Sequence, residues 1–121
     1  MTNQPLLASD RSFVVFSYAM SHGLLLLRSR KFPPATPTRL DILFQDVRAL
    51  EIRCWFDGLT IEETDVHFLE GARSIPAPLM EHGNKVYALK SSGWVGFVVG
   101  GIVSFHEDQG ELFEPSKLIP A

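Results

Sequence analysis

Apolar and polar residues alternate with period 2 along most of the chain, a pattern that predicts short β-strands. The predicted strands cover residues 12–19, 23–30, 39–44, 48–57, 85–90 and 93–105, with a last short run at 111–113. Turn residues separate these runs, including the proline-rich segments 33–37 and 75–78. Residues 1–11 are expected to be a loose lead-in. We therefore predict a single all-β domain over residues 1–121, either an antiparallel sandwich or a strongly curled sheet of six to eight strands.

Short connections between these runs predict hairpins. Residues 20–22 join the first two strands, and residues 45–47 form a second tight connection between 39–44 and 48–57. The segment 60–71 is ambiguous, because Thr60 to Glu63 fits a helix-capping box whereas the β-branched residues fit a strand. An α+β fold with one short helix is therefore kept as an alternative. Residues 78–83 are a candidate for one further helical turn.

The most apolar stretch is "GWVGFVVGGIVSF", residues 93–105. It is shorter than the roughly 20 apolar residues that a membrane-spanning helix needs. Its glycines precede a strand-like sequence, whereas a phosphate-binding glycine loop precedes a helix. We predict one long strand with a bend at Gly100 and Gly101. Its core-facing residues would be Val95, Phe97, Val99, Val103 and Phe105.

The opposite side of this stretch carries almost no side chain at Gly96, Gly100 and Ser104. Such a strip permits close packing of another layer, or it forms the floor of a shallow groove beneath Trp94. We favour close packing.

The segment 48–57 alternates in the same way. Leu50, Ile52, Cys54 and Phe56 would face the core, so Cys54 is interpreted as a buried apolar residue. The predicted interaction surface lies on the other sides of the two strands and consists of Arg53, Trp55, Asp57 and Trp94. An exposed tryptophan often marks an interface. The alternative is that a second layer of the fold covers this surface.

The charge balance excludes some partners. The chain has 11 basic and 14 acidic residues and a net charge of −3, which does not provide the positive field of a nucleic-acid-binding protein. A short basic cluster around Arg28 and Arg30, with Arg39 nearby, is a candidate site for one anionic group, although a solvated strand end is the simpler interpretation. The mild overall acidity suits a basic protein partner.

Metal and catalytic signatures are lacking in the sequence. The four histidines do not have metal-ligand spacing, and a single cysteine allows neither an intrachain disulfide nor a cysteine-based zinc site. We therefore expect no metal and no cofactor. His22 and His106 remain candidate ligand contacts. The N-terminal residues do not resemble a signal peptide, so we expect a cytoplasmic protein that is not inserted in a membrane.

Three runs, "SHGLLLLRSRK", "RLDILFQDVRALEIR" and "LFEPSKL", resemble small uncharacterised bacterial β-rich proteins, some of which are similar to immunity proteins encoded beside secreted toxins. The likeness spans about half of the chain and includes no active-site motif. It implies a non-enzymatic, partner-binding role.

Three functions follow, in order of preference. The first is a non-catalytic domain that binds a protein partner or forms a homodimer. The second is a small-ligand or carbohydrate-binding domain in which Trp55 or Trp94 stacks on the ligand. The third is a hydrolase or metal enzyme that uses His22 or His106.

Overall fold

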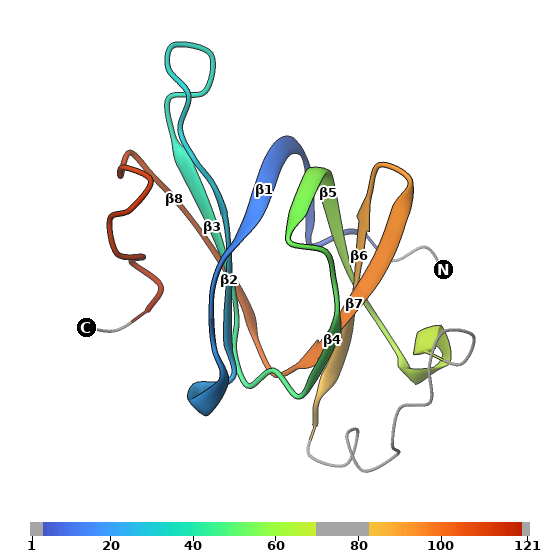
Figure 1. Cartoon of the computed structure of the whole chain (residues 1–121). Coiled ribbons are helices and arrows are strands. Elements are labelled where there is room, and N and C mark those ends of the chain that lie inside the picture. The colour runs from blue at the N-terminus through green and yellow to red at the C-terminus, as the bar shows by residue number, and fades with distance from the viewer. Residues whose placement is uncertain (1–3, 70–82, 120–121) are drawn as a thin grey trace.

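The computed structural model describes residues 4–69 and 83–119 and contains a single open sheet of eight antiparallel strands (Figure 1). The sheet order is β4-β7-β6-β5-β1-β2-β3-β8. The strands are β1 (Leu7–Ala19), β2 (Leu24–Ser29), β3 (Arg39–Phe44), β4 (Ala49–Glu51), β5 (Trp55–Thr64), β6 (Lys85–Ser91), β7 (Trp94–Gly100) and β8 (Val103–Asp108). Within the described residues the helical elements are two 3-10 turns, η1 (Met20–His22) and η2 (Val66–Leu69). The predicted all-β fold is confirmed.

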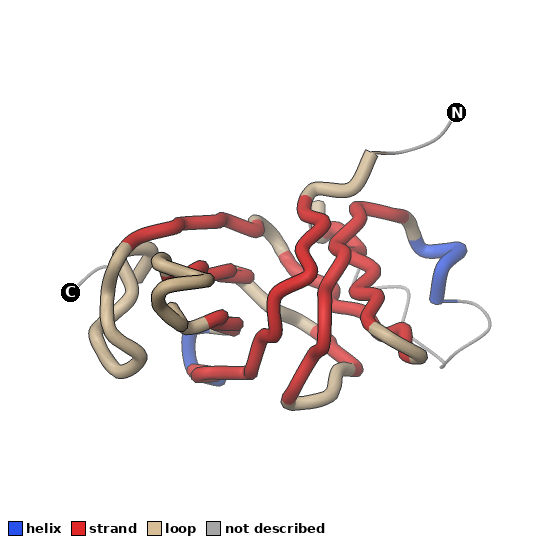
Figure 2. The backbone as a smooth tube through the Cα atoms, turned by 90° about the horizontal axis from the view of Figure 1, so that it is seen from above, coloured by secondary structure: helices blue, strands red, loops and turns tan. Residues whose placement is uncertain are grey.

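The long strand β1 gives the sheet its curl. Residues 7–14 of β1 pair with β5, and residues 14–19 pair with β2, with irregular register at two places along the strand. Such irregularities bend a strand and increase its twist. The sheet therefore curls, as the view from above in Figure 2 shows, where η2 and the C-terminal segment lie at opposite ends of the molecule.

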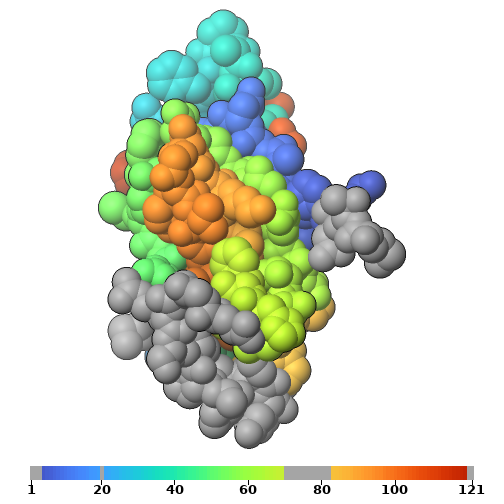
Figure 3. All heavy atoms as spheres, turned by 90° about the vertical axis from the view of Figure 1, so that its right-hand side faces the viewer, coloured from blue at the N-terminus to red at the C-terminus, as the bar shows by residue number. Residues whose placement is uncertain are grey.

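The main core lies inside the curl. Phe44 of β3 contacts Tyr87 of β6, with ring centroids 5.5 Å apart, although β3 and β6 are not neighbours in the sheet. Twelve buried residues form this cluster: Phe13, Leu25, Leu27, Ile42, Phe44, Val47, Phe56, Leu59, Ile61, Tyr87, Leu89 and Val98. A second cluster, of Leu69, Val86, Phe97 and Val99, joins η2 to β6 and β7. Figure 3 shows this side of the molecule, with β6 and β7 in orange and η2 in yellow-green.

Several predicted elements are confirmed. β3 has the predicted bounds, and β1 and β2 form a hairpin through η1. β6 and β7 also pair with each other, through a turn at Gly93. Gly93 has a φ of 68°, a conformation that glycine adopts at no steric cost. In the ambiguous segment, β5 continues to Thr64 and is followed by η2, so the described part holds no α-helix. Residues 78–82 of the predicted helical turn lie outside the described residues.

Several expectations about single segments were wrong. β1 begins at Leu7, so residues 7–11 are paired with β5 or bulged beside it rather than loose. The segment 48–57 is two strands, because β4 pairs with β7 whereas β5 pairs with β1 and β6. Residues 45–47 are therefore no hairpin; they connect β3 to a strand that pairs elsewhere in the sheet. The run 111–113 is not a strand.

Cys54 lies between β4 and β5, where the alternation ends, and it is exposed. The prediction that it is buried was wrong. The alternating pattern indicated a continuous strand, but the chain turns at residues 52–54 and the side chain is directed away from the core.

The predicted long strand 93–105 is divided into β7 and β8. The bend was placed correctly: Gly101 donates its backbone N–H to the Gln45 carbonyl (2.9 Å), and its own carbonyl accepts a bond from the Tyr87 hydroxyl (2.8 Å). β7 then pairs with β6 and β8 pairs with β3, at different places in the sheet. The prediction of a single continuous strand was therefore wrong.

The assignment of core-facing residues in this stretch was correct only in part. Val98 faces the main core and Phe97 and Val99 face the second cluster, so both sides of β7 are buried there. Val95 and Phe105 are exposed.

Two positions of the predicted strip, Gly96 and Gly100, pack closely as predicted, whereas Ser104 lies on β8 and pairs with β3. A Cβ atom at Gly96 would overlap the Glu51 carbonyl oxygen and the Trp94 ring. A Cβ atom at Gly100 would lie 3.2 Å from the Gln45 carbonyl oxygen. The strip is therefore occupied by the Trp94 ring and by the connection from β3 to β4.

Candidate binding pocket on the outer face of the sheet

Strand register aligns several charged and aromatic residues on the outer face of the sheet. Directly paired residues of antiparallel strands place their side chains on the same side. The aligned residues, in order across β5, β1, β2, β3 and β8, are Trp55, Val14, Arg28, Asp41 and His106. The neighbours Phe13 and Phe56 point inward and are fully buried. Alternation along the strands therefore presents this row on the face opposite the core.

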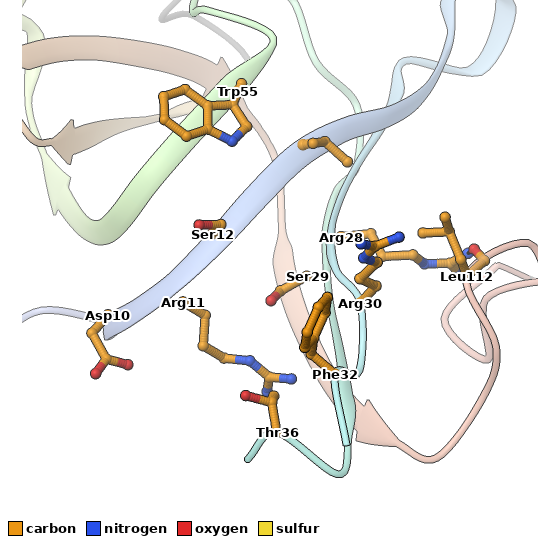
Figure 4. Close-up of a pocket in the computed structure, with 11 residues that line it drawn as sticks. Asp10, Arg11, Ser12, Arg28, Ser29, Arg30, Phe32, Thr36, Trp55 and Leu112 are labelled. Atoms are coloured by element: carbon orange, nitrogen blue, oxygen red, sulfur yellow. Dashed lines mark hydrogen bonds between the residues drawn. The ribbon is translucent and has the colours of Figure 1, made fainter. Parts of the chain in front are cut away.

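A cavity of about 670 Å³ lies at the β5 end of this row (Figure 4). Trp55, at the beginning of β5, is 50% exposed, and Phe32, in the loop that follows β2, is 63% exposed. Val14 of β1 lies between β5 and β2 and also remains exposed. The remaining lining residues are Asp10, Arg11, Ser12, Arg28, Ser29, Arg30, Thr36 and Leu112. We call this cavity the Trp55 pocket.

Arg28 lines the pocket with its charge already paired with a carboxylate of the protein. It is 1% exposed, and its guanidinium group makes a two-pronged ion pair with Asp41, with Nε–Oδ1 and Nη2–Oδ2 distances of 2.7 and 3.0 Å. Its Nη1 donates to the carbonyl oxygens of Leu112 (2.6 Å) and Glu114 (3.0 Å). Its predicted role as a free anion contact was therefore wrong. Internal acceptors occupy all three guanidinium nitrogens.

Arg39 makes a matching arrangement beside it. Its Nε and Nη2 bind the Asp108 carboxylate at 3.0 and 2.9 Å, and Nη1 donates to the carbonyl oxygens of Glu111 and Glu114. The hydrogen bonds from Arg39 lower the pKa of Asp108 to about 2, and the same interaction raises the pKa of Arg39. Two buried arginines thus hold the C-terminal segment against the outer face of β2 and β3. In the sequence, Arg39 and Asp41 alternate with apolar residues, which indicates that they share one face of a strand. No residue close to them in the sequence indicated their ion-pair partners.

Arg30 differs from these two. Its guanidinium carbon lies 5.3 Å from the centroid of the Phe32 ring, and it makes no hydrogen bond or ion pair with any other residue that the structure describes. The side chain is exposed at the rim of the Trp55 pocket. Of the predicted anion contacts, Arg30 is the one that is available to a ligand there.

Arg11 lines the pocket from β1. Its terminal nitrogens donate to the side chain and the carbonyl of Thr38, and Nη1 lies 3.8 Å from the Glu107 carboxylate. Its Nε is buried without a hydrogen-bond partner in the described part of the chain. Asp10, on the same strand, is exposed at the rim (Figure 4).

The predicted interaction surface is divided between two sides of the sheet. Trp55 lines the pocket, and Asp57, two residues further along β5, pairs with Ser12 beside it. Trp94 is instead on the inner side: its ring packs against Phe56 at 5.4 Å, and Arg53 lies 5.3 Å above it. Trp94 was therefore placed on the wrong side by the sequence, because the Val/Phe side of β7 was taken as its only buried face.

The two candidate histidines are not brought together. His22 lies in η1, where its Nδ1 is 2.9 Å from the Ser21 hydroxyl, whereas His106 is on β8, opposite Asp41. The Nε2 of His106 lies 3.6 Å from an Asp108 carboxylate oxygen, which Arg39 already binds. Among residues 4–69 and 83–119, no group of three or more His, Cys, Asp or Glu side chains is placed to hold a metal ion.

Comparison with known proteins gives no match: no family model, no curated protein and no solved structure is significantly similar to the chain. None of the helical turns in the described ranges is long and apolar enough to cross a bilayer. The fold and the Trp55 pocket therefore carry the functional argument by themselves.

Proposed function

We propose that the protein is a non-catalytic binding domain that holds a protein partner at the Trp55 pocket. One observation carries the proposal. Two large aromatic side chains lie on opposite sides of one cavity, and Trp55 is 50% exposed and Phe32 63% exposed. Exposed apolar side chains that gather around one hollow often mark a binding site, whereas isolated ones are common on protein surfaces. Tryptophan is also enriched among the residues that dominate binding energy at interfaces.

The construction of the pocket supports binding rather than chemistry. Its charged groups are three arginines and Asp10, and arginine stays protonated at physiological pH, so it binds anions but does not transfer protons. The buried Arg28–Asp41 pair fixes one wall, and a preorganised wall lowers the conformational entropy that the protein itself must lose on binding.

A small ligand is the second candidate. The cavity volume of about 670 Å³ is within the range of about 300 to 1,000 Å³ that is typical of ligand pockets. Trp55 would then stack on a planar or sugar ring, as the sequence analysis anticipated.

A peptide-display selection tests the proposal. A library of random dodecamer peptides is selected on the wild-type protein, without depletion on any variant. We expect peptides that bind the wild type and lose at least about tenfold in affinity for Trp55→Ala, because truncating a central aromatic anchor typically removes 2 kcal/mol or more. The measurement is isothermal calorimetry on individual synthetic peptides.

The matched control is Ile102→Ala, which removes another exposed apolar side chain, at the bend between β7 and β8 and outside the pocket. Peptide affinity should be unchanged in this variant. Peptides that bind wild type, Trp55→Ala and Ile102→Ala equally would contradict a binding site at Trp55.

A further inference from the structure

The chemistry of the Trp55 pocket indicates the kind of segment it binds. We infer that it takes an acidic, extended segment of a protein partner, in which an apolar side chain covers Trp55 and a carboxylate pairs with Arg30. This inference rests on the proposed function and adds the charge and the spacing of the partner's contacts. It departs from the expectation of a basic partner, because it follows Arg30, which makes no ion pair within the described part of the chain, and not the net charge of the whole chain.

The charge assignment follows from which cations are already paired. Arg28 is neutralised by Asp41, and Arg11 is bound to Thr38 and lies near Glu107. Arg30 alone among the three lining arginines makes no ion pair within the described residues. Its planar group rests over Phe32, which limits its freedom and leaves its donor edge for a carboxylate.

The spacing follows from the strand geometry. Trp55 and Arg28 occupy one row, two strands apart, which corresponds to about 10 Å at the usual strand separation. Arg30 lies two residues further along the chain, a displacement of about 7 Å. The backbone positions of Trp55 and Arg30 are thus about 12 Å apart, and the groups that contact a ligand differ from this span by about the length of a side chain. An extended peptide rises about 3.3 Å per residue, so the apolar and acidic residues of the partner would be two to four residues apart.

The rim of the pocket favours an extended peptide. Ser12 is exposed on β1 and lines the pocket together with Trp55 and Arg30, and its hydroxyl group can donate to or accept from a passing backbone. The pocket therefore offers apolar, polar and cationic contacts to one segment.

The experiment uses the peptides recovered from the display selection on the full chain. We expect them to carry an excess of Asp and Glu, with one acidic residue two to four positions from an aromatic or aliphatic residue. Replacing that acidic residue by its amide should weaken binding to the wild type about 1.5- to fivefold at low salt, which is the range for a partly exposed ion pair. The same replacement should have no effect on binding to Arg30→Ala.

Two variants complete the test. Arg48→Ala changes the net charge by the same amount as Arg30→Ala but lies outside the pocket and should leave peptide affinity unchanged. Asp10→Asn removes the one carboxylate of the rim and should strengthen binding of the acidic peptides, because it removes a like charge.

Three results would overturn the inference. Peptides that depend on Trp55 but are neutral or basic, or whose affinity depends on Asp10 rather than Arg30, would reject the acidic partner while leaving the proposed function intact. Single-stranded oligonucleotides that bind more tightly than the peptides, and lose affinity in Arg30→Ala, would replace the peptide by another polyanion. Dimerisation of the wild type that Trp55→Ala abolishes would identify a second copy of the chain as the occupant.

Discussion

The Arg39–Asp108 pair gives a prediction that can be worked from the structure. In the substitution Asp108→Asn, the side chain keeps its shape but loses the charge that faces a 1% exposed guanidinium group. The folded protein holds the pKa of Asp108 at about 2, against an ordinary value of 3.8, chiefly through the hydrogen bonds from Arg39. This difference corresponds to about 2 kcal/mol of folding free energy at pH 7. Asp108→Asn should therefore lower the free energy of unfolding by about 2 kcal/mol at that pH.

The pH dependence has a definite sign. Because the folded-state pKa is lowered, the stabilisation is complete above the unfolded-state pKa near 4 and is lost as the pH falls through about 2. At pH 3 about half of it remains, since the unfolded chain already binds most of a proton there. Urea unfolding of wild type and Asp108→Asn at pH 7 and at pH 3 measures both values.

Glu63→Gln is the matched control, because it makes the same carboxylate-to-amide change in an exposed pair with Lys85. It should alter stability by less than about 0.5 kcal/mol. A stability difference between wild type and Asp108→Asn that is equal at pH 7 and pH 3 would refute the reasoning, since the lost charge could not then be its origin.

Two further predictions test the packing of β7. Val98→Ala should lower the free energy of unfolding by about 2 kcal/mol, because the Val98 side chain is fully buried in the main core. Val95 lies on the same strand and is 55% exposed, so Val95→Ala should change the free energy of unfolding by less than about 0.5 kcal/mol. Equal losses in urea unfolding would show that the burial is wrongly assigned. Gly96→Ala should lower the free energy of unfolding by about 1 to 3 kcal/mol, because the added methyl group overlaps the Glu51 carbonyl and the Trp94 ring. Thermal unfolding followed by Trp94 fluorescence in a Trp55→Phe background measures this loss, and an unchanged melting temperature would contradict the close packing.

Local alternation and turn chemistry were sufficient for the class of fold and for the β1–β2 hairpin. Along β3, apolar residues with two interspersed charges gave the correct bounds, and the turn at η1 gave the pairing of β1 with β2. These features depend only on residues that are close in sequence, which is why they can be read there. The bend at Gly100 and Gly101 belongs to the same group.

Which strands pair with each other, and which charged side chains are buried, depended on the tertiary structure. Alternation indicates that one face of a strand is buried but does not identify what covers it, so the inner position of Trp94 and the separate pairings of β7 and β8 could not be predicted. Arg28 is buried because Asp41 and the carbonyl of Leu112, which is 84 residues away in the sequence, satisfy its donors. Arg30, two residues along, has no such partners among the described residues and stays at the rim. The alternating sequence places Arg28 and Arg30 on one face of the predicted strand. Only the tertiary structure determines that Arg28 is buried in an ion pair while Arg30 stays exposed, because their environments depend on acceptors from segments that are distant in the sequence.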